Sequence, residues 1–241
     1  MKTIVTLLAL IGGNCMAAEI TNWEFKAGEA RSIRMNTEAG GVTLVAAEGS
    51  SVKAEIVGEY STEKCEIRAE VSGGELLLKA SAKKRWFWKN SACKTGFKVY
   101  APAGTKIFSK TSAGNVEVGA FSSGADISVG AGNIKLAGLS GPIKISIGAG
   151  NVKGEIYSED MACKTGTGAL DLDWKNAPKA GKASIHAGMG TIALSFPAES
   201  KLNISNSTGM GGFNSEIGSD PSAAFRLDIK NGMGSTWIKK S

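Results

Sequence analysis

Histidine and proline are scarce in this sequence, which has one histidine and five prolines among 241 residues. The single histidine, His186, falls at an outward position of an alternating segment, with no recurring acid or nucleophile to orient it. The acidic residues are scattered, and no zinc-ligand spacing or calcium-binding loop is present. We therefore predict no catalytic residue, no metal and no cofactor, and expect that the protein is not an enzyme.

Long apolar runs are absent after the N-terminus, where no segment reaches the roughly 18 consecutive residues of a transmembrane helix. The chain itself begins with Lys2, an apolar run (Ile4–Ile11) and small residues, which is the order of a secretory signal peptide. We predict that residues 1–18 are a signal peptide cleaved near Ala17 or Ala18. A lipoprotein signal centred on Cys15 is the weaker alternative. The mature protein is expected to be periplasmic, cell-surface or secreted.

Acidic residues are missing from Leu76 to Val116, although the chain as a whole has a net charge of only +6. This interval holds nine basic residues, which are Lys79, Lys83, Lys84, Arg85, Lys89, Lys94, Lys98, Lys106 and Lys110. The rest of the chain is slightly acidic. The sequence thus predicts a local basic patch rather than a generally basic protein.

Glycine is abundant, and its GxG motifs recur at fixed intervals. The closing glycines are Gly114, Gly132, Gly150, Gly168, Gly190, Gly211 and Gly234. The first four are evenly spaced, at a constant interval of about 18 residues, and the later intervals are longer, about 21–23 residues. Such a constant period indicates stacked structural repeats. A phosphate-binding glycine loop is disfavoured, because each GxG is followed by strand-like alternation and not by a helix N-terminus. We therefore interpret these glycines as corners between strands.

Residues on both sides of each corner alternate between apolar and polar, as half-buried strands require. Stacking at the glycine interval places Asp126 beside Lys144 and Lys153 beside Asp171 on the outward face. It also aligns a column of asparagine side chains that could hydrogen-bond from unit to unit, at Asn115, Asn133 and Asn151.

These features predict an all-β fold, a single parallel β-solenoid with coils of about 18–23 residues. A two-sheet sandwich is the alternative, but nothing in a sandwich requires a constant period. We expect regular repeats over residues 107–241. Residues 19–106 form a less regular N-terminal part, with a hairpin or loop inserted at about 79–95. Gly40 has the same register, and its separation from Gly114 in the sequence corresponds to about four units.

The cysteines divide according to this register. Cys163 occupies the inward position of Ile127 and Ile145, and we expect a buried, unreactive thiol. Cys65 and Cys93 are left to form a disulfide, which suits an exported protein. The repeated ACKTG sequence around Cys93 and Cys163 leaves a mixed pairing open.

Methionine occupies the middle of the last three GxG corners, at Met189, Met210 and Met233. Soft-metal binding is one interpretation of such a column. Smaller residues hold the same position in the earlier units, so we favour a packing column graded by size.

One segment, KKRWFWKN at Lys83–Asn90, lies outside the register. Three consecutive aromatic residues cannot all be buried on one face of a strand. Aromatic rings beside cations suit an anionic membrane surface, an acidic glycan or single-stranded nucleic acid, the last being disfavoured for an exported protein. Coverage of an open flank of the solenoid is the alternative. The candidate binding residues are Lys83, Lys84, Arg85, Trp86, Phe87, Trp88 and Lys89.

The segment FKVYAPAGTKIFSKTSAGNVEV, followed by GAGNIKL, GAGNVKG, GTGALDL and GMGTIAL, resembles a bacterial family of unknown function labelled "putative adhesin". The resemblance covers roughly Ile33 to Ile238. It implies an exported or membrane-tethered single β-solenoid without agreed catalytic residues. The aromatic-basic segment and its disulfide depart from many relatives, so their role is expected to be particular to this chain.

Together these observations predict an exported, non-enzymatic adhesin or cell-envelope binding protein that contacts an anionic surface or glycan. A protein partner is a further option. The alternatives are a self-associating structural scaffold and, less favoured, a glycan-active enzyme.

Overall fold

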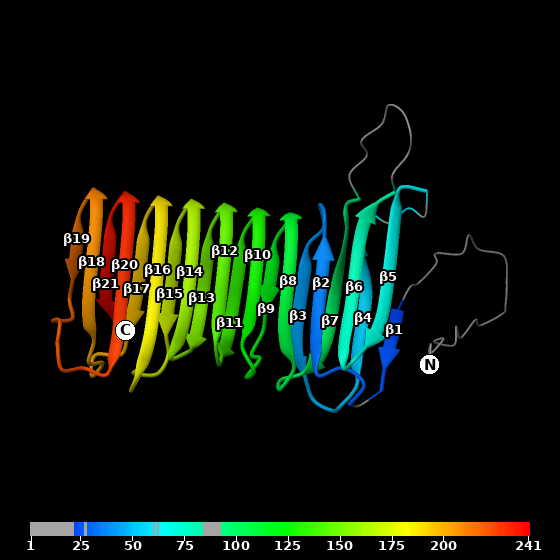
Figure 1. The fold of residues 1–241 in the computed structure, drawn as a ribbon, viewed down its shortest axis with the longest axis horizontal. Coiled ribbons are helices and arrows are strands. Elements are labelled where there is room, and N and C mark those ends of the chain that lie inside the picture. Colours follow the sequence, from blue (N-terminus) through cyan, green and yellow to red (C-terminus); the bar gives the residue numbers. More distant parts are fainter. Residues whose placement is uncertain (1–21, 27, 60, 62, 84–92) are drawn as a thin grey trace.

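The structure, a computed structural model, describes residues 22–26, 28–59, 61, 63–83 and 93–241. Every regular element in these ranges is a β-strand, and the 21 strands form one sheet of 11 strands and another of 10 (Figure 1). The all-β prediction is confirmed. None of the described elements is a helix with the length and apolar character needed to cross a bilayer.

We refer to the 11-stranded sheet as sheet A and to the 10-stranded sheet as sheet B. The sequence predicts a single solenoid, whereas the strands form these two separate hydrogen-bonded sheets. Sheet A has the spatial order β1 (Asn22–Phe25), β4 (Val52–Gly58), β7 (Thr95–Pro102), β3 (Val42–Ala47), β9 (Val116–Val118), β11 (Ile134–Ser140), β13 (Val152–Tyr157), β15 (Leu170–Trp174), β17 (Ile192–Phe196), β21 (Thr236–Lys240) and β19 (Phe213–Ser215). Sheet B has the order β18 (Asn203–Met210), β20 (Phe225–Met233), β16 (Gly181–Met189), β14 (Asp160–Thr167), β12 (Ile143–Ala149), β10 (Ala125–Ala131), β8 (Lys106–Ala113), β2 (Ser32–Thr37), β6 (Glu75–Ala82) and β5 (Cys65–Ser72).

In the middle of the chain, successive strands alternate between the two sheets, and we call one strand of sheet B with the next strand of sheet A a coil. Each strand pairs in parallel with the equivalent strand of the following coil, so that Ile127 faces Ile145 and Ile134 faces Val152. The partners in each pair are separated along the chain by the same interval as the evenly spaced glycines. The sequence period is therefore the length of one coil.

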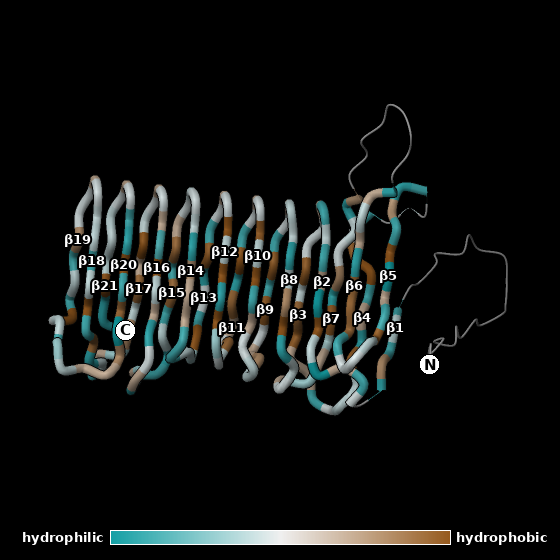
Figure 2. The backbone as a smooth tube through the Cα atoms, viewed as in Figure 1, coloured by the Kyte–Doolittle hydropathy of each residue, from teal (hydrophilic) through white to brown (hydrophobic). Residues whose placement is uncertain are grey.

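The core lies between the sheets and consists of the inward-facing alternate residues. Figure 2 shows hydrophobic residues recurring from strand to strand along the stack. Cys163 lies in register between Ile145 and Ile185, and all three side chains are buried, as the pattern predicts for the cysteine. Trp174 stacks on Phe196 with ring centroids 4.4 Å apart.

The outward columns also have the predicted register. Lys144 Nζ lies 3.3 Å from Asp126 Oδ2, and Lys153 Nζ lies 3.5 Å from Asp171 Oδ2. Both pairs are exposed, so each contributes little stability and mainly favours the correct register. The asparagine column is confirmed, because Asn133 and Asn151 each donate through both backbone and side-chain nitrogens to the preceding asparagine Oδ1.

The seven GxG glycines all adopt positive φ, between 130° and 150°. At Gly150 the backbone also passes so close to the preceding coil that a Cβ atom would overlap the carbonyl oxygen of Gly132. A side chain is therefore excluded there both by conformation and by space.

At the N-terminal end, the prediction of about four units between Gly40 and Gly114 is wrong. Strands β2 and β3 pair directly with β8 and β9, and Gly40 is stacked on Gly114. The intervening chain folds outward, so that β6 and β7 lie on the other side of β2 and β3. Beyond them β1, β4 and β5 pair antiparallel, which makes this part less regular than the rest.

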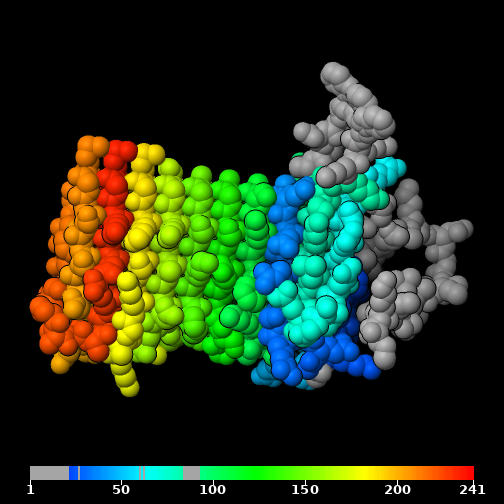
Figure 3. Space-filling view, in the orientation of Figure 1, coloured from blue at the N-terminus to red at the C-terminus, as the bar shows by residue number. Residues whose placement is uncertain are grey.

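The C-terminal end also departs from chain order. Strands β20 and β21 insert between the coil β16–β17 and the coil β18–β19, which is outermost. Figure 3 shows the red C-terminal residues between the yellow and orange ones. In β20, Leu227 and Ile229 are buried inward residues, whereas β18 places the polar Asn206 opposite Ile229 and the polar Thr208 at its next inward position. Ile204 of β18 also faces inward, opposite Leu227, so the difference is one of degree: the more apolar coil is covered on both sides, and the coil with more polar inward residues ends the stack.

Candidate functional site

The segment Lys83–Lys89 is the strongest candidate from the sequence, but of its residues only Lys83 is described. Lys84, Arg85, Trp86, Phe87, Trp88 and Lys89 lie outside the described residues. The structure does define the two points where the segment leaves and rejoins the sheets. Strand β6 ends at Ala82, and the chain is described again from Cys93, just before β7.

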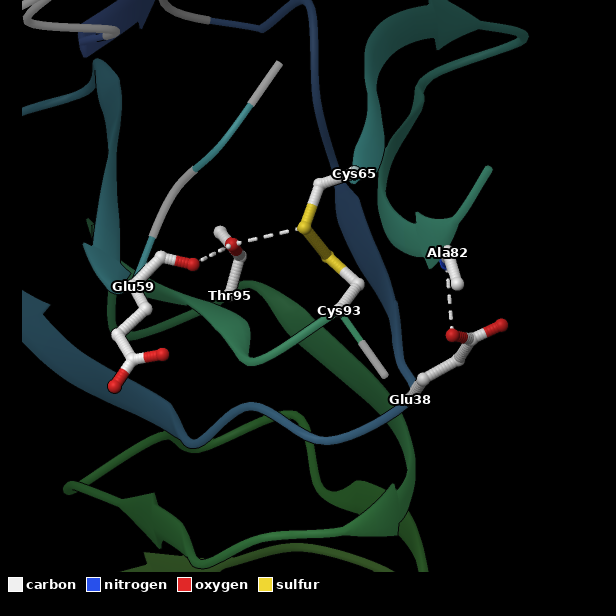
Figure 4. Close-up of a disulfide and its surroundings, with 6 residues drawn as sticks. All are labelled: Glu38, Glu59, Cys65, Ala82, Cys93 and Thr95. Carbon is white, nitrogen blue, oxygen red and sulfur yellow. Dashed lines mark hydrogen bonds between the residues drawn. A yellow bond between two sulfur atoms is a disulfide. The ribbon is translucent and has the colours of Figure 1, made fainter. Parts of the chain in front are cut away.

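A disulfide between Cys65 and Cys93 closes the base of this segment, as predicted (Figure 4). Cys65 begins β5, and its side chain and that of Cys93 are buried. Thr95 lies beneath the disulfide, where its hydroxyl is 3.4 Å from Cys65 Sγ and donates to the backbone oxygen of Glu59 at 2.8 Å. The disulfide is therefore part of a packed, hydrogen-bonded base rather than an isolated surface link.

Hydrogen bonds from both ends of the segment reinforce this base. The backbone nitrogen of Ala82 donates to Glu38 Oε2 at 2.7 Å (Figure 4). Lys83 N donates to the carbonyl oxygen of Lys64 at 2.9 Å. On the other side, Ala39 N donates to the carbonyl oxygen of Cys93. The segment's ends are thus held by the residues just after β2 and by the start of β5.

The basic residues around the segment are divided between surfaces. On the outer face of sheet B, Lys79 and Lys110 flank Asn36 in register, and Arg68 lies beside Lys79 on the next strand. Lys98 instead lies in β7 of sheet A. Of the residues in the predicted basic patch, Lys79 and Lys110 therefore share this face with Arg68, which lies outside the predicted interval, and Lys98 does not belong to the face.

Acidic partners neutralise some cations nearby. Arg68 forms a salt bridge to Glu66 at 2.6 Å, and this contact raises the pKa of Arg68 and lowers the pKa of Glu66. Arg34 hydrogen-bonds Glu75 through Nε and Nη2, at 2.9 and 3.0 Å. The face is consequently mixed in charge, with lysines as its least compensated members among the described residues.

His186 lies on the outer face of sheet B between Lys164 and Lys230. Burial, and next the charges of these lysines, lower the pKa of His186. Its Nε2 atom is 3.4 Å from Ser184 Oγ. The nearest carboxylate in the adjacent strand, Asp228, is paired with Arg226 and Lys182 at 2.9 and 3.0 Å. This carboxylate is thus bound to cations. To orient a catalytic histidine, it would have to bind the imidazole instead.

Metal-binding groups of the usual kind do not converge within the described residues. No set of three or more His, Cys, Asp or Glu side chains there could hold a metal ion. The free thiol of Cys163 is buried, and burial raises its pKa to about 12. It is therefore protonated at neutral pH and inaccessible to a metal.

The methionine column does not have the packing role predicted for it. Met189, Met210 and Met233 are 44%, 65% and 40% exposed, because the middle residue of each GxG corner points away from the core. The alternation of inward and outward side chains stops at the corner. The sequence period alone therefore could not show whether these methionines are buried or exposed.

A surface feature missed from the sequence surrounds Trp237 in β21, which is 41% exposed on the outer face of sheet A. A groove of about 420 Å³ runs beside it between β17, β19 and β21, lined by Ala193, Asn214, Glu216 and Lys239 among others. The outward position of Trp237 follows from the alternation around Ile238, which could have revealed it.

No protein-family model and no curated protein sequence matches this chain. Among solved structures, the chain is similar to a putative cell adhesion protein from Clostridium sporogenes, with 16% identity, a TM-score of 0.44, and coverage of 92% of this chain and 100% of that one. It is also similar to a putative adhesin from Bacteroides fragilis, with 15% identity, a TM-score of 0.45, and coverage of 93% and 98%. A putative lipid binding protein from Parabacteroides distasonis has 14% identity, a TM-score of 0.38, and coverage of 93% and 97%. Similarities of this degree do not assign a function to the present chain.

Proposed function

We propose that this protein is an exported, non-enzymatic binding protein that presents the segment Lys83–Lys89 to an anionic surface, either a membrane or an acidic glycan. The observation that carries the proposal is the disulfide-closed base, which joins this one segment outside the repeat register to the buried core. An aromatic and cationic segment held at both ends loses less conformational entropy on binding than a free one.

Export is supported by the disulfide, because structural disulfides persist in oxidising compartments and are rare in the cytosol. A cleaved leader over residues 1–18 is consistent with this location. These residues lie outside the described part of the chain.

We further infer that the two sheets are the two faces of one β-solenoid, with residues 107–241 as its regular part and residues 19–106 as its irregular end. The constant parallel register in both sheets supports this interpretation. The base of the proposed binding segment then lies at the irregular end. A solenoid is a rigid support, because each coil is held by hydrogen bonds to both neighbours.

The test measures binding to phosphatidylglycerol vesicles, to neutral phosphatidylcholine vesicles and to an acidic polysaccharide such as alginate. We expect binding to at least one anionic ligand and none to neutral vesicles. Binding should weaken from about 0.1 M to about 1 M salt, because the screening length falls from about 10 Å to about 3 Å.

Matched variants separate the segment from the rest of the surface. Trp86→Ala with Trp88→Ala, and Lys84→Gln with Arg85→Gln, should each abolish binding. Trp237→Ala removes an exposed tryptophan elsewhere, and Lys164→Gln with Lys230→Gln removes two distant cations, so both controls should bind normally. Undiminished binding by the segment variants would refute the proposal.

A self-associating scaffold is the second candidate function, favoured by the free edges of the end strands β18 and β19 in sheets B and A. The polar inward residues of this outermost coil, such as Asn206 and Thr208, reduce the drive to cover it. Sedimentation that finds only monomer at high protein concentration would exclude this alternative.

A further inference from the structure

The three methionines of the C-terminal corners form a continuous row of exposed thioethers. Met210 is in register with Met233, and Met233 is in register with Met189. Their strands, β18, β20 and β16, are direct neighbours and end at the same edge of the stack (Figure 1). Adjacent strands are about 4.8 Å apart, so the three side chains leave the backbone within reach of a common point.

The order of this row differs from the order of the methionines in the chain. The insertion of β20 between β16 and β18 puts Met233 between the other two. The row is bounded by Thr167 of β14 on one side, while β18 is the last strand of the sheet on the other. It therefore comprises three sulfur donors side by side.

The remaining methionines of the described chain are in a different environment. Met35 and Met161 are buried, with 0% and 2% exposure, whereas all members of the row are at least 40% exposed. Exposure of an apolar residue three times at one register position is unexpected from packing alone. Each of the three is also flanked on both sides by glycine, so no neighbouring side chain in the corner covers its sulfur.

The chemistry of the row narrows the class of ligand. A thioether is soft, polarisable and uncharged, and it binds hard or borderline divalent cations such as Mg²⁺ and Zn²⁺ poorly. Soft monovalent cations, Cu(I) and Ag(I), accept thioether sulfur readily. The long unbranched side chains allow the sulfurs to converge without movement of the strands.

We propose that Met189, Met233 and Met210 form a binding site for one soft monovalent cation, Cu(I) in an exported protein. The site is at the opposite end of the stack from the base of the Lys83–Lys89 segment, so it is independent of the function proposed above. Because a thioether has no proton to lose, the affinity should not depend on pH across the range in which histidine and cysteine sites weaken.

The site is tested by anaerobic competition between the full chain and the Cu(I) chelator bicinchoninate. We expect the chain to hold one Cu(I), and the variant Met189→Leu, Met210→Leu and Met233→Leu to hold one fewer. Leucine has a similar apolar volume but no sulfur atom. The comparison therefore distinguishes coordination of Cu(I) by sulfur from nonspecific binding to an apolar surface. Circular dichroism and thermal unfolding should be unchanged, because the replaced side chains are exposed.

Two control variants address other ligands. Cys163→Ala and His186→Gln should retain the Cu(I), since the thiol is buried and the imidazole lies on another part of the face. A loss in either control with retention in the leucine variant would overturn the assignment. So would equal Cu(I) content in the leucine variant and the parent, or a clear decrease in affinity from about pH 8 to about pH 6.

A second measurement uses Ag(I), which undergoes no redox change during the experiment. The methyl carbon resonances of Met189, Met210 and Met233 should shift on addition of one equivalent, whereas those of Met35 and Met161 should not. Absence of any shift in the three exposed residues would refute the site even if the protein holds the ion elsewhere.

Discussion

Replacement of Gly150 by alanine provides the most direct test of the stacked corners. Gly150 has a φ of 137°, which L-residues rarely adopt, and its nitrogen donates to the carbonyl oxygen of Thr167 at 2.9 Å. An added Cβ would overlap the backbone carbonyl of Gly132 in the neighbouring coil. Since the obstacle is backbone and not the end of a flexible side chain, relief requires that two coils separate.

The expected cost has two parts. Backbone strain at an unfavourable φ contributes about 1–3 kcal/mol, and overpacking against a fixed neighbour contributes a further 1–3 kcal/mol or so. We therefore expect Gly150→Ala to lower the free energy of unfolding by about 2–6 kcal/mol.

Gly212→Ala is the control, because Gly212 lies directly after a GxG corner but has neither a positive φ nor any atom within 4 Å of the added Cβ. It should change the free energy of unfolding by no more than about 0.5 kcal/mol. The assay is guanidinium unfolding followed by circular dichroism, supported by hydrogen exchange at residues 132–152 in case the stack unfolds in parts. If Gly150→Ala were no more destabilised than Gly212→Ala, the reasoning about close-packed corners would be refuted.

Three further predictions concern the disulfide, the exposed methionines and His186. Replacement of both Cys65 and Cys93 by alanine opens a link across 28 residues and should lower the free energy of unfolding by about 3–4 kcal/mol; a loss below about 1 kcal/mol in denaturant titrations would contradict this. Mild peroxide should oxidise Met189, Met210 and Met233 well before Met35 and Met161, and mass spectrometry showing equal rates would contradict the exposures. Because burial and neighbouring lysines lower the pKa of His186 below 6.5, the folded state resists its protonation, and stability should fall as pH decreases through 6.5 towards that lower value. His186→Gln should remove this contribution, so a stability difference from wild type that is constant with pH would contradict the effect.

Much of the fold follows from one pattern in the sequence. The constant interval between glycines correctly places Cys163 in the core and pairs Lys144 with Asp126, because register is repeated from one coil to the next. The disulfide could be predicted for the same reason, since assigning Cys163 to the core leaves Cys65 and Cys93 to pair.

The candidate sites were less accessible to this reasoning. Met189 is the last residue of β16, where the inward and outward alternation ends, so alternation could not show that its side chain is exposed. Trp237 was missed although it continues the outward column of Lys153, Asp171 and Ala193, because these preceding members of the column are not aromatic. The segment Lys83–Lys89 was found by the opposite route, as an interruption of the repeat.

By itself, the sequence determined which residues form strands, which face the core, and where each corner lies, because these are local properties of alternation and of glycine. Only the tertiary structure decided the order in which the coils stack. Several coils have a register that would allow parallel pairing with a given coil. The stacking order that leaves the least apolar surface exposed is favoured among them. The polar inward residues Asn206 and Thr208 can end the stack, whereas Leu227 and Ile229 must be covered, and so the last coil of the chain is not the last coil of the molecule. That exchange also sets the order of the methionine row, with Met233 between Met189 and Met210.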